Sequence, residues 1–171
     1  QDHKFSQFCK NILVMSQRIA IFDDNKNIRE SIAMLLNTMP DLLVVGTFSH
    51  VLDCVDDVKE CKPDIVLMDI EMPGMTGIEA VKAIKKELPH IQILMQTVFE
   101  DDENIFQSLF FGADGYLLKN LSAEKIVEAI REVNEGGSPM SPGVARKVVA
   151  LFKSFSSPKH KAPEFELSDR E

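Results

Sequence analysis

Several short apolar runs in this sequence end at polar residues whose side chains suit phosphoryl chemistry. These residues are Asp23 and Asp24 after the first run, Asp69 after the second, Thr97 after the third and Lys119 after the fourth. If the runs are parallel strands of one sheet, three carboxylates, a hydroxyl and an ammonium group meet at its carboxyl edge. Open α/β sheets bind their ligands at that edge.

The chemistry that this set predicts is metal-assisted phosphoryl transfer. Mg²⁺ prefers oxygen ligands and is held by carboxylates together with phosphate oxygens, and Asp23, Asp24 and Asp69 offer such ligands. An aspartate can attack a phosphoryl group, and Asp69 is the best-placed nucleophile because it stands alone at the tip of the central strand. Lys119 can pair with a phosphoryl oxygen as a compact charge, and Thr97 can donate to another. Taken alone, each residue also fits a helix cap or a solvated charge, so the prediction rests on their coincidence.

Strand and helix patterns alternate five times along residues 18–134. The expected strands are 18–22, 42–45, 64–68, 91–95 and 115–118, and the expected helices are 25–38, 50–61, 76–88, 101–111 and 122–134. Strands that are apolar throughout indicate a parallel sheet with helices on both faces. The common order for five units is 2-1-3-4-5, as in flavodoxin. This order places Asp69 at the centre of the edge.

Composition narrows the function classes. The net charge is −8, and residues 1–145 hold 13 basic and 23 acidic residues, so direct binding to nucleic acid is not expected of this acidic body. The three cysteines, Cys9, Cys54 and Cys61, fit no zinc pattern and are interpreted as reduced thiols of a cytoplasmic protein. No apolar run is long enough for a membrane span, and no signal peptide is expected. Met15 is a candidate natural start.

Residues 18–135 resemble the receiver domain of two-component response regulators. The motifs that carry the resemblance are Asp23-Asp24, the segment 62–77, Thr97 and the segment 112–119. The resemblance implies that Asp69 accepts a phosphoryl group from a sensor histidine kinase. It also implies a Mg²⁺ site in which Asp24 binds directly, Asp23 binds partly through water, and Asp69 and the backbone carbonyl of Glu71 are further ligands.

The same resemblance implies a switch. Thr97 corresponds to the switch hydroxyl, Lys119 to the phosphate-binding lysine, and Tyr116 to the aromatic residue that rotates inward when Thr97 moves. The face formed by 101–111, 115–118 and 122–134 is expected to change shape on phosphorylation. Three phenylalanines on it are more aromatic side chains than the buried side of one helix requires. These are Phe106, Phe110 and Phe111. Such a protein is not an enzyme beyond its own phosphorylation and autodephosphorylation.

The C-terminal part is similar to NarL/FixJ regulators, whose output is a LuxR-type helix-turn-helix. The features are Asn120 after Lys119, Gly136-Gly137 and a helix start at Ser141-Pro142. The expected division is an extension (1–17), the receiver (18–135), a linker with a helix at 144–155 (136–166), and the first residues of a truncated output domain (167–171). DNA binding is then expected only through the missing output domain, and a homodimer is the expected assembly.

Three residues depart from the pattern of common receivers. Val98 replaces a frequent alanine and is expected to narrow access to Asp69, while Asn120 replaces a proline. Glu71 either orients or repels the water that hydrolyses the phosphoaspartate.

Two other functions fit this sequence less well. A phosphorylation-independent dimerisation module should have lost one of the site acids or Lys119, and none of these residues is lost. A phosphatase of the haloacid-dehalogenase type needs a second aspartate where Glu71 stands.

Overall fold

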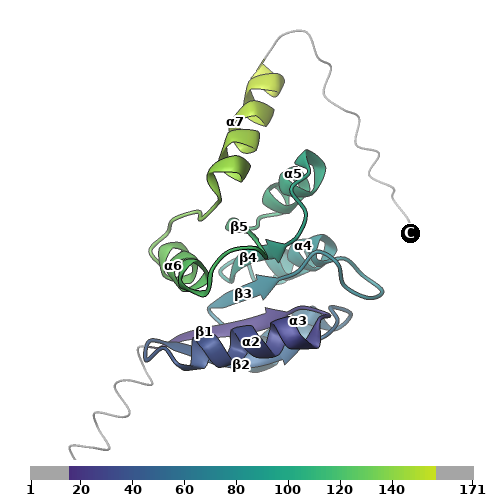
Figure 1. The fold of residues 1–171 in the computed structure, drawn as a ribbon. Helices are drawn as coiled ribbons and strands as arrows, with labels where there is room; N and C mark the ends of the chain where they lie inside the picture. Colours follow the sequence, from purple (N-terminus) through teal and green to yellow (C-terminus); the bar gives the residue numbers. More distant parts are fainter. Residues whose placement is uncertain (1–15, 157–171) are drawn as a thin grey trace, which may run out of the picture.

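Residues 16–156, which the structure describes, form a five-stranded parallel sheet with helices on both faces (Figure 1). The structure is a computed structural model. The strand order is β2-β1-β3-β4-β5, so the predicted order is confirmed. The strands are β1 (Gln17–Phe22), β2 (Leu42–Phe48), β3 (Ile65–Met68), β4 (Gln92–Thr97) and β5 (Gly115–Leu118). The helices are α2 (Lys26–Asn37), α3 (Cys54–Cys61), α4 (Gly77–Glu87), α5 (Asp102–Phe110), α6 (Ala123–Asn134) and α7 (Pro142–Ser156).

Some predictions fall on parts of the chain that are not described. Most of the expected N-terminal extension, with Cys9 and Met15, lies outside the described residues, as do the end of the linker and the expected output-domain start at 167–171. Within residues 16–156, no helix is long and apolar enough to cross a membrane.

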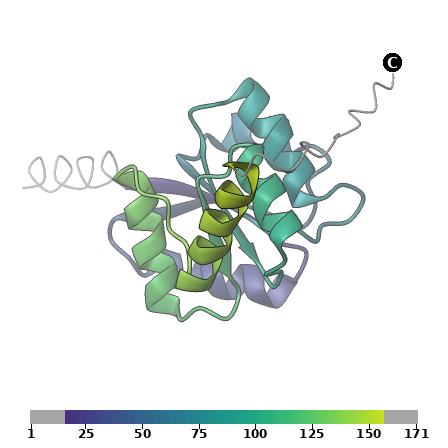
Figure 2. The same cartoon turned by 90° about the horizontal axis from the view of Figure 1, so that it is seen from above.

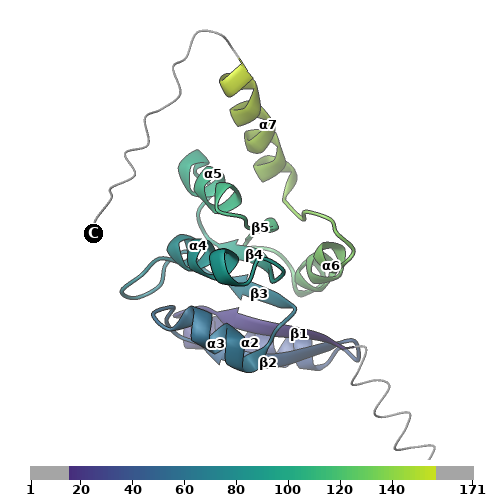
Figure 3. The same cartoon turned by 180° about the vertical axis from the view of Figure 1, so that it is seen from behind.

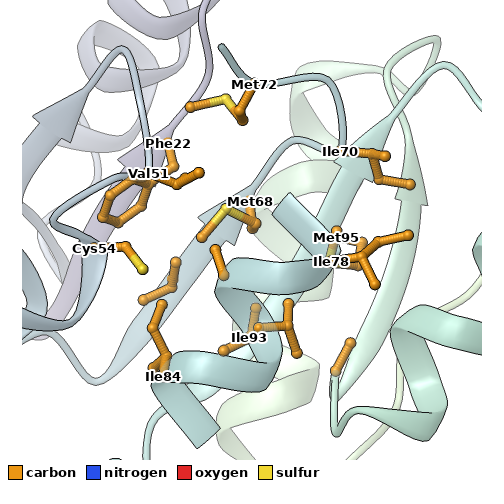
Figure 4. Close-up of a cluster of buried hydrophobic side chains, with 14 of the residues drawn as sticks. Phe22, Val51, Cys54, Met68, Ile70, Met72, Ile78, Ile84, Ile93 and Met95 are labelled. Atoms are coloured by element: carbon orange, nitrogen blue, oxygen red, sulfur yellow. The ribbon is translucent and has the colours of Figure 1, made fainter. Parts of the chain in front are cut away.

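Two hydrophobic clusters, one on each face of the sheet, hold the fold together. Ile19 and Ile21 of β1 pack into the cluster shared with α2 and α6. Ala20 and Phe22 alternate with them and pack into the cluster shared with α3, α4 and α5. Figure 4 shows part of this second cluster, in which Phe22 lies beside Val51 and Cys54, whereas Ile93 and Met95 lie near α4. Because both faces are covered, the strands need apolar residues at successive positions.

Two element boundaries differ clearly from the prediction. The helix expected from residue 50 begins only at Cys54, because Val51 belongs to the preceding loop, where it is fully buried and its carbonyl accepts from the Cys54 N–H. A buried loop residue produces the same apolar spacing as a helical turn. Strand β2 continues to Phe48, and its register against β1 shifts between Ile19 and Ala20. The shift leaves Val45 without a partner on β1, next to Gly46, and a glycine inside a strand often marks such a bulge.

Helix α7 follows α6 and lies beside α5, beyond the β5 edge of the sheet (Figures 2 and 3). Ser141 caps it, since its Oγ accepts from the Val144 N–H at 3.2 Å, and Pro142 is the first helical residue. Both predictions about this helix start are confirmed, although the helix begins two residues before 144. Val144 is only 2% exposed and packs into the same cluster as Tyr116, so α7 is packed against the sheet domain.

Candidate functional site

The ends of four strands bring the predicted site residues to one edge of the sheet. Asp23 follows β1, Asp69 follows β3, Thr97 is the last residue of β4 and Lys119 follows β5. Backbone pairing continues past the strands, because the Asp69 N–H donates to the carbonyl of Phe22 at 2.9 Å and the Lys119 N–H donates to that of Thr97 at 2.8 Å. The site residues are therefore held by the same hydrogen-bond ladder that holds the sheet.

Lys119 joins two of the predicted carboxylates directly. Its Nζ lies 2.7 Å from Oδ2 of Asp69 and 2.7 Å from Oδ2 of Asp23. The three side chains are only 11%, 5% and 3% exposed, in the order Lys119, Asp69 and Asp23. Since they are largely removed from water, the attraction between these charges is less screened than in a surface ion pair. Burial alone would lower the pKa of Lys119, but its hydrogen bonds to Asp23 and Asp69 outweigh burial and raise that pKa.

Both carboxylate oxygens of Asp69 have a hydrogen-bond partner in this buried place. Burial raises the pKa of its carboxyl group above the ordinary value, and the nearby Asp23 adds to this, while the hydrogen bond from Lys119 acts in the opposite direction. Oδ1 of Asp69 accepts from the Ile70 N–H at 2.7 Å. One oxygen is thus held by the backbone, and the other is presented to Lys119.

Three carboxylates could share one cation here. Asp23, Asp24 and Asp69 each offer an oxygen, and these three oxygens lie within 4.8 Å of one another. Asp23 and Asp69 are buried, whereas Asp24 is exposed, so the cluster is open to water on one side. Hard oxygen donors with room for water are the ligands that Mg²⁺ prefers. Glu71 is exposed and is not part of this cluster, so the role of its carbonyl stays a prediction.

The loop after Asp69 returns to the site at Gly77. The Gly77 N–H donates to the carbonyl of Ile70 at 2.9 Å, and a Cβ atom placed on Gly77 would lie 1.7 Å from the backbone oxygen of Asp69. A capping box fixes the start of α4 there, because Thr76 and Glu79 each accept a hydrogen bond from the other's backbone N–H. The motif around Gly77 does not by itself predict this packing requirement. The available signal is a glycine at the first helical position, directly after Thr76 and inside the Thr-x-x-Glu capping box.

Thr97 and Tyr116 meet at the loop that follows β4. Both side chains are fully buried. The Thr97 Oγ accepts from the Phe99 N–H at 3.3 Å, and the Tyr116 hydroxyl donates to the Phe99 carbonyl at 2.9 Å. Burial raises the pKa of Tyr116, and the nearby carboxylate of Asp101 adds to the shift. The predicted switch residues are thus linked through one loop residue, Phe99, whose role no sequence pattern indicates because it acts through its backbone.

Two large apolar side chains, those of Val98 and Phe110, lie at the surface of this region. Val98 is 67% exposed and Phe110 is 71% exposed. Phe110 stacks on Phe106, with ring centroids 5.7 Å apart, and contacts Phe111 edge-on. Phe111 packs against the core. The predicted excess of aromatic bulk on this helix is therefore partly core and partly surface.

Comparison with known proteins gives the family. The family model described as the response regulator receiver domain matches residues 19–131. The chain belongs to this family. Receiver domains bind Mg²⁺ at an acidic pocket, and in this receiver the cluster of Asp23, Asp24 and Asp69 forms such a pocket.

Transcriptional and response regulators are among the similar proteins. The chain is 40% identical to the transcriptional regulatory protein LnrK of Bacillus subtilis over 136 residues, which are 80% of this chain and 62% of LnrK. It is 37% identical to the response regulator protein VraR of Staphylococcus epidermidis over 158 residues, which are 92% of this chain and 73% of VraR. The chain therefore matches less than two thirds of the length of LnrK.

Solved structures agree with this placement. A LuxR-family two-component response regulator from Aurantimonas sp. SI85-9A1 aligns with a TM-score of 0.75 and 29% identity, covering 81% of this chain and 99% of that one. The receiver domain of the putative response regulator NarL from Mycobacterium tuberculosis aligns with a TM-score of 0.67 and 30% identity, covering 71% and 98%. The predicted resemblance to LuxR-type receivers is confirmed.

Proposed function

We propose that Asp69 is the phosphoacceptor of this receiver and takes its phosphoryl group from a phosphohistidine of a sensor histidine kinase. The observation that carries the proposal is the position of the Lys119 ammonium group, which lies 2.7 Å from a carboxylate oxygen of Asp69 and of Asp23. A lysine in this place is next to any phosphoryl group that forms on Asp69. The family membership and the LuxR-type relatives support the same function.

In the proposed reaction, a carboxylate oxygen of Asp69 attacks the phosphorus atom. A phosphorus–oxygen bond forms, the phosphorus–nitrogen bond of the donor breaks, and the imidazole nitrogen keeps the electron pair. Lys119 then exchanges its contact with the carboxylate for one with a phosphoryl oxygen, and the Thr97 hydroxyl donates to another. These donors stabilise charge in a site where little water competes.

A divalent cation completes the proposed site. Asp23, Asp24, Asp69 and the backbone carbonyl of Glu71 would hold Mg²⁺, and Asp24 has the exposed position suited to a partly hydrated ion. When bound, Mg²⁺ neutralises charge on the phosphoryl oxygens and offsets the repulsion between the carboxylates. The chain's own residues keep the acceptor oxygen in place through the backbone contact of Ile70 with Asp69.

The output is proposed from the relatives rather than from this receiver itself. We expect phosphorylation to control transcription through a LuxR-type DNA-binding domain that begins at residues 167–171, with 136–166 as a linker, and to promote a homodimer. A phosphorylation adds about two negative charges, and the Thr97, Phe99 and Tyr116 contacts would carry its effect away from Asp69.

Intact-mass spectrometry after incubation with acetyl phosphate tests the proposal. The chain should gain one phosphoryl group in the presence of Mg²⁺ and none when the metal is removed by a chelator. Asp69→Asn, which keeps the size of the side chain, should gain none under either condition. Absence of the mass gain in the unmodified chain, or its persistence in Asp69→Asn, would contradict Asp69 as acceptor and favour a phosphorylation-independent module.

A further inference from the structure

A lysine of α7 reaches the loop that connects β4 to α5. The Nζ of Lys147 hydrogen-bonds to the backbone carbonyl of Glu100 and lies 3.3 Å from Oδ1 of Asp102. The Lys147 side chain is 38% exposed, so its ammonium group is partly covered. Both partners stand within five residues of Thr97, whereas Lys147 is far along the chain in the linker helix.

The same loop is held from the sheet side at the residue before Glu100. Phe99 donates its N–H to the Thr97 hydroxyl and accepts from the Tyr116 hydroxyl through its carbonyl. Two consecutive loop residues are therefore fixed by side chains from β4, β5 and α7. A hydroxyl has two acceptor lone pairs and one donor hydrogen, so Thr97 keeps its hydrogen for another acceptor while it binds Phe99.

Helix α7 is itself anchored to β5. The Tyr116 N–H donates to the carbonyl of Pro139 at 3.0 Å, and the Ser138 hydroxyl donates to the carbonyl of Asp114 at 2.6 Å. Val144, in the first turn of α7, is buried in the core. Because the start of α7 is fixed, Lys147 has a defined position from which it can hold the β4–α5 loop. Figure 1 shows α7 above β5, close to α5.

We propose that Lys147 is a positioning residue for the phosphoryl-transfer site. By holding Glu100 and Asp102, it keeps the β4–α5 loop in the arrangement in which Phe99 orients the Thr97 hydroxyl with its hydrogen available for a phosphoryl oxygen. Orienting a reacting group in advance saves the entropy of ordering it during the reaction. The inference rests on the proposed function of Asp69, and it ties the rate at this site to the docking of the helix that leads out of the receiver.

The test measures how fast acetyl phosphate phosphorylates each of four chains in the presence of Mg²⁺, with intact-mass spectrometry as the assay. The four are the original sequence and the variants Lys147→Met, Lys147→Arg and Arg146→Met. Lys147→Met removes the ammonium group and keeps much of the apolar stem, and it should slow the reaction by about two- to fivefold, as expected for one partly exposed charged hydrogen bond. Lys147→Arg should restore the rate, since a guanidinium group can donate to both partners. The matched control is Arg146→Met, which removes the same charge from the same helix at an exposed position whose side-chain hydrogen bond stays within α7.

A second readout follows the loop and the linker without any phosphate. The chain has one tyrosine and no tryptophan, so its tyrosine fluorescence reports on Tyr116 alone and should change in Lys147→Met but not in Arg146→Met. Hydrogen exchange at the Tyr116 amide, which donates to Pro139, measures linker docking and should be faster in Lys147→Met.

The outcomes separate the two proposals. If the unmodified chain gains no phosphoryl group, the proposed function fails, and the Tyr116 readouts still decide whether Lys147 holds the loop. If the chain is phosphorylated but Lys147→Met reacts and fluoresces like the unmodified chain, the inference is wrong and the proposed function stands. Equal slowing in Lys147→Met and Arg146→Met would also overturn the inference, because the effect would then come from the loss of positive charge on the helix in general.

Discussion

Gly77→Ala should damage both the stability of the receiver and its phosphorylation. A Cβ atom at residue 77 would lie 1.7 Å from the backbone oxygen of Asp69 and 2.8 Å from its carbonyl carbon. Ordinary contacts begin near 3.4 Å, so α4 or the end of β3 must move by about 1.7 Å to reach one. The obstacle is backbone that takes part in the sheet ladder, since Asp69 donates to Phe22, and it cannot rotate away like a flexible side chain.

The size of the effect follows from two opposing contributions. Alanine is favoured over glycine within a helix by up to about 1 kcal/mol, whereas overpacking of a well-packed site costs about 1–3 kcal/mol and sometimes more. Because the overlap is with backbone, the overpacking cost lies toward the upper end of that range, and after the helix contribution is subtracted we expect the free energy of unfolding to fall by about 1–2 kcal/mol. Because a misplacement of about 1 Å in a reacting group can cost about 100-fold in rate, phosphorylation of Asp69 should slow by at least about tenfold.

Urea unfolding and the acetyl phosphate mass assay measure the two effects. Gly143→Ala is the matched control, because it is also a glycine in the first turn of a helix, and a Cβ atom there would meet nothing closer than the Ser141 Oγ at 3.8 Å. It should leave the rate unchanged and the stability equal or slightly higher. If Gly77→Ala behaves like Gly143→Ala in both assays, the close approach of α4 to Asp69 does not position the acceptor.

Three further predictions concern other parts of the receiver. Asp101→Ala removes the N-cap of α5, which accepts from the Asn104 N–H at 2.9 Å, and should cost about 1 kcal/mol in urea unfolding at pH 7. The hydrogen bond from the Asn104 N–H holds the pKa of Asp101 below 3.8. The stability that Asp101 contributes is therefore present above pH 3.8 and is lost as the pH falls through the lowered pKa. A difference in free energy of unfolding between the original chain and Asp101→Ala that does not shrink in acid would contradict this. Burial raises the pKa of Cys54 to about 11, so only about one thiol in a thousand is ionised at pH 8. Peptide mapping should therefore show that iodoacetamide alkylates Cys54 slowly in the folded chain and fast in urea. Fast alkylation of Cys54 in the folded chain would refute this prediction. Val98→Ala should be phosphorylated faster by acetyl phosphate than the unmodified chain, because a smaller side chain after Thr97 leaves more access to Asp69, and equal rates would reject that explanation.

The sequence predicted the residues at the sheet edge because these depend on local patterns, and it predicted the strand order because five such units commonly adopt that order. Each apolar run has to be a strand buried on two faces, and the polar residue that ends it has to stand at the carboxyl edge. Asp23, Asp69, Thr97 and Lys119 therefore reach one edge whatever the details of packing. Helix starts were also readable, since a cap such as Ser141 acts on residues close to it in the chain.

Contacts between residues far apart in the chain were decided by the tertiary structure alone. No local pattern shows that Lys119 binds two carboxylates at once, that Gly77 meets the backbone of Asp69, or that Lys147 supports the loop after Thr97. The sequence determined which chemical groups stand at the end of each strand, because local periodicity and caps fix the elements. The folded chain decided which of these groups touch, because such contacts depend on the packing of helices and loops whose positions are set by the whole core.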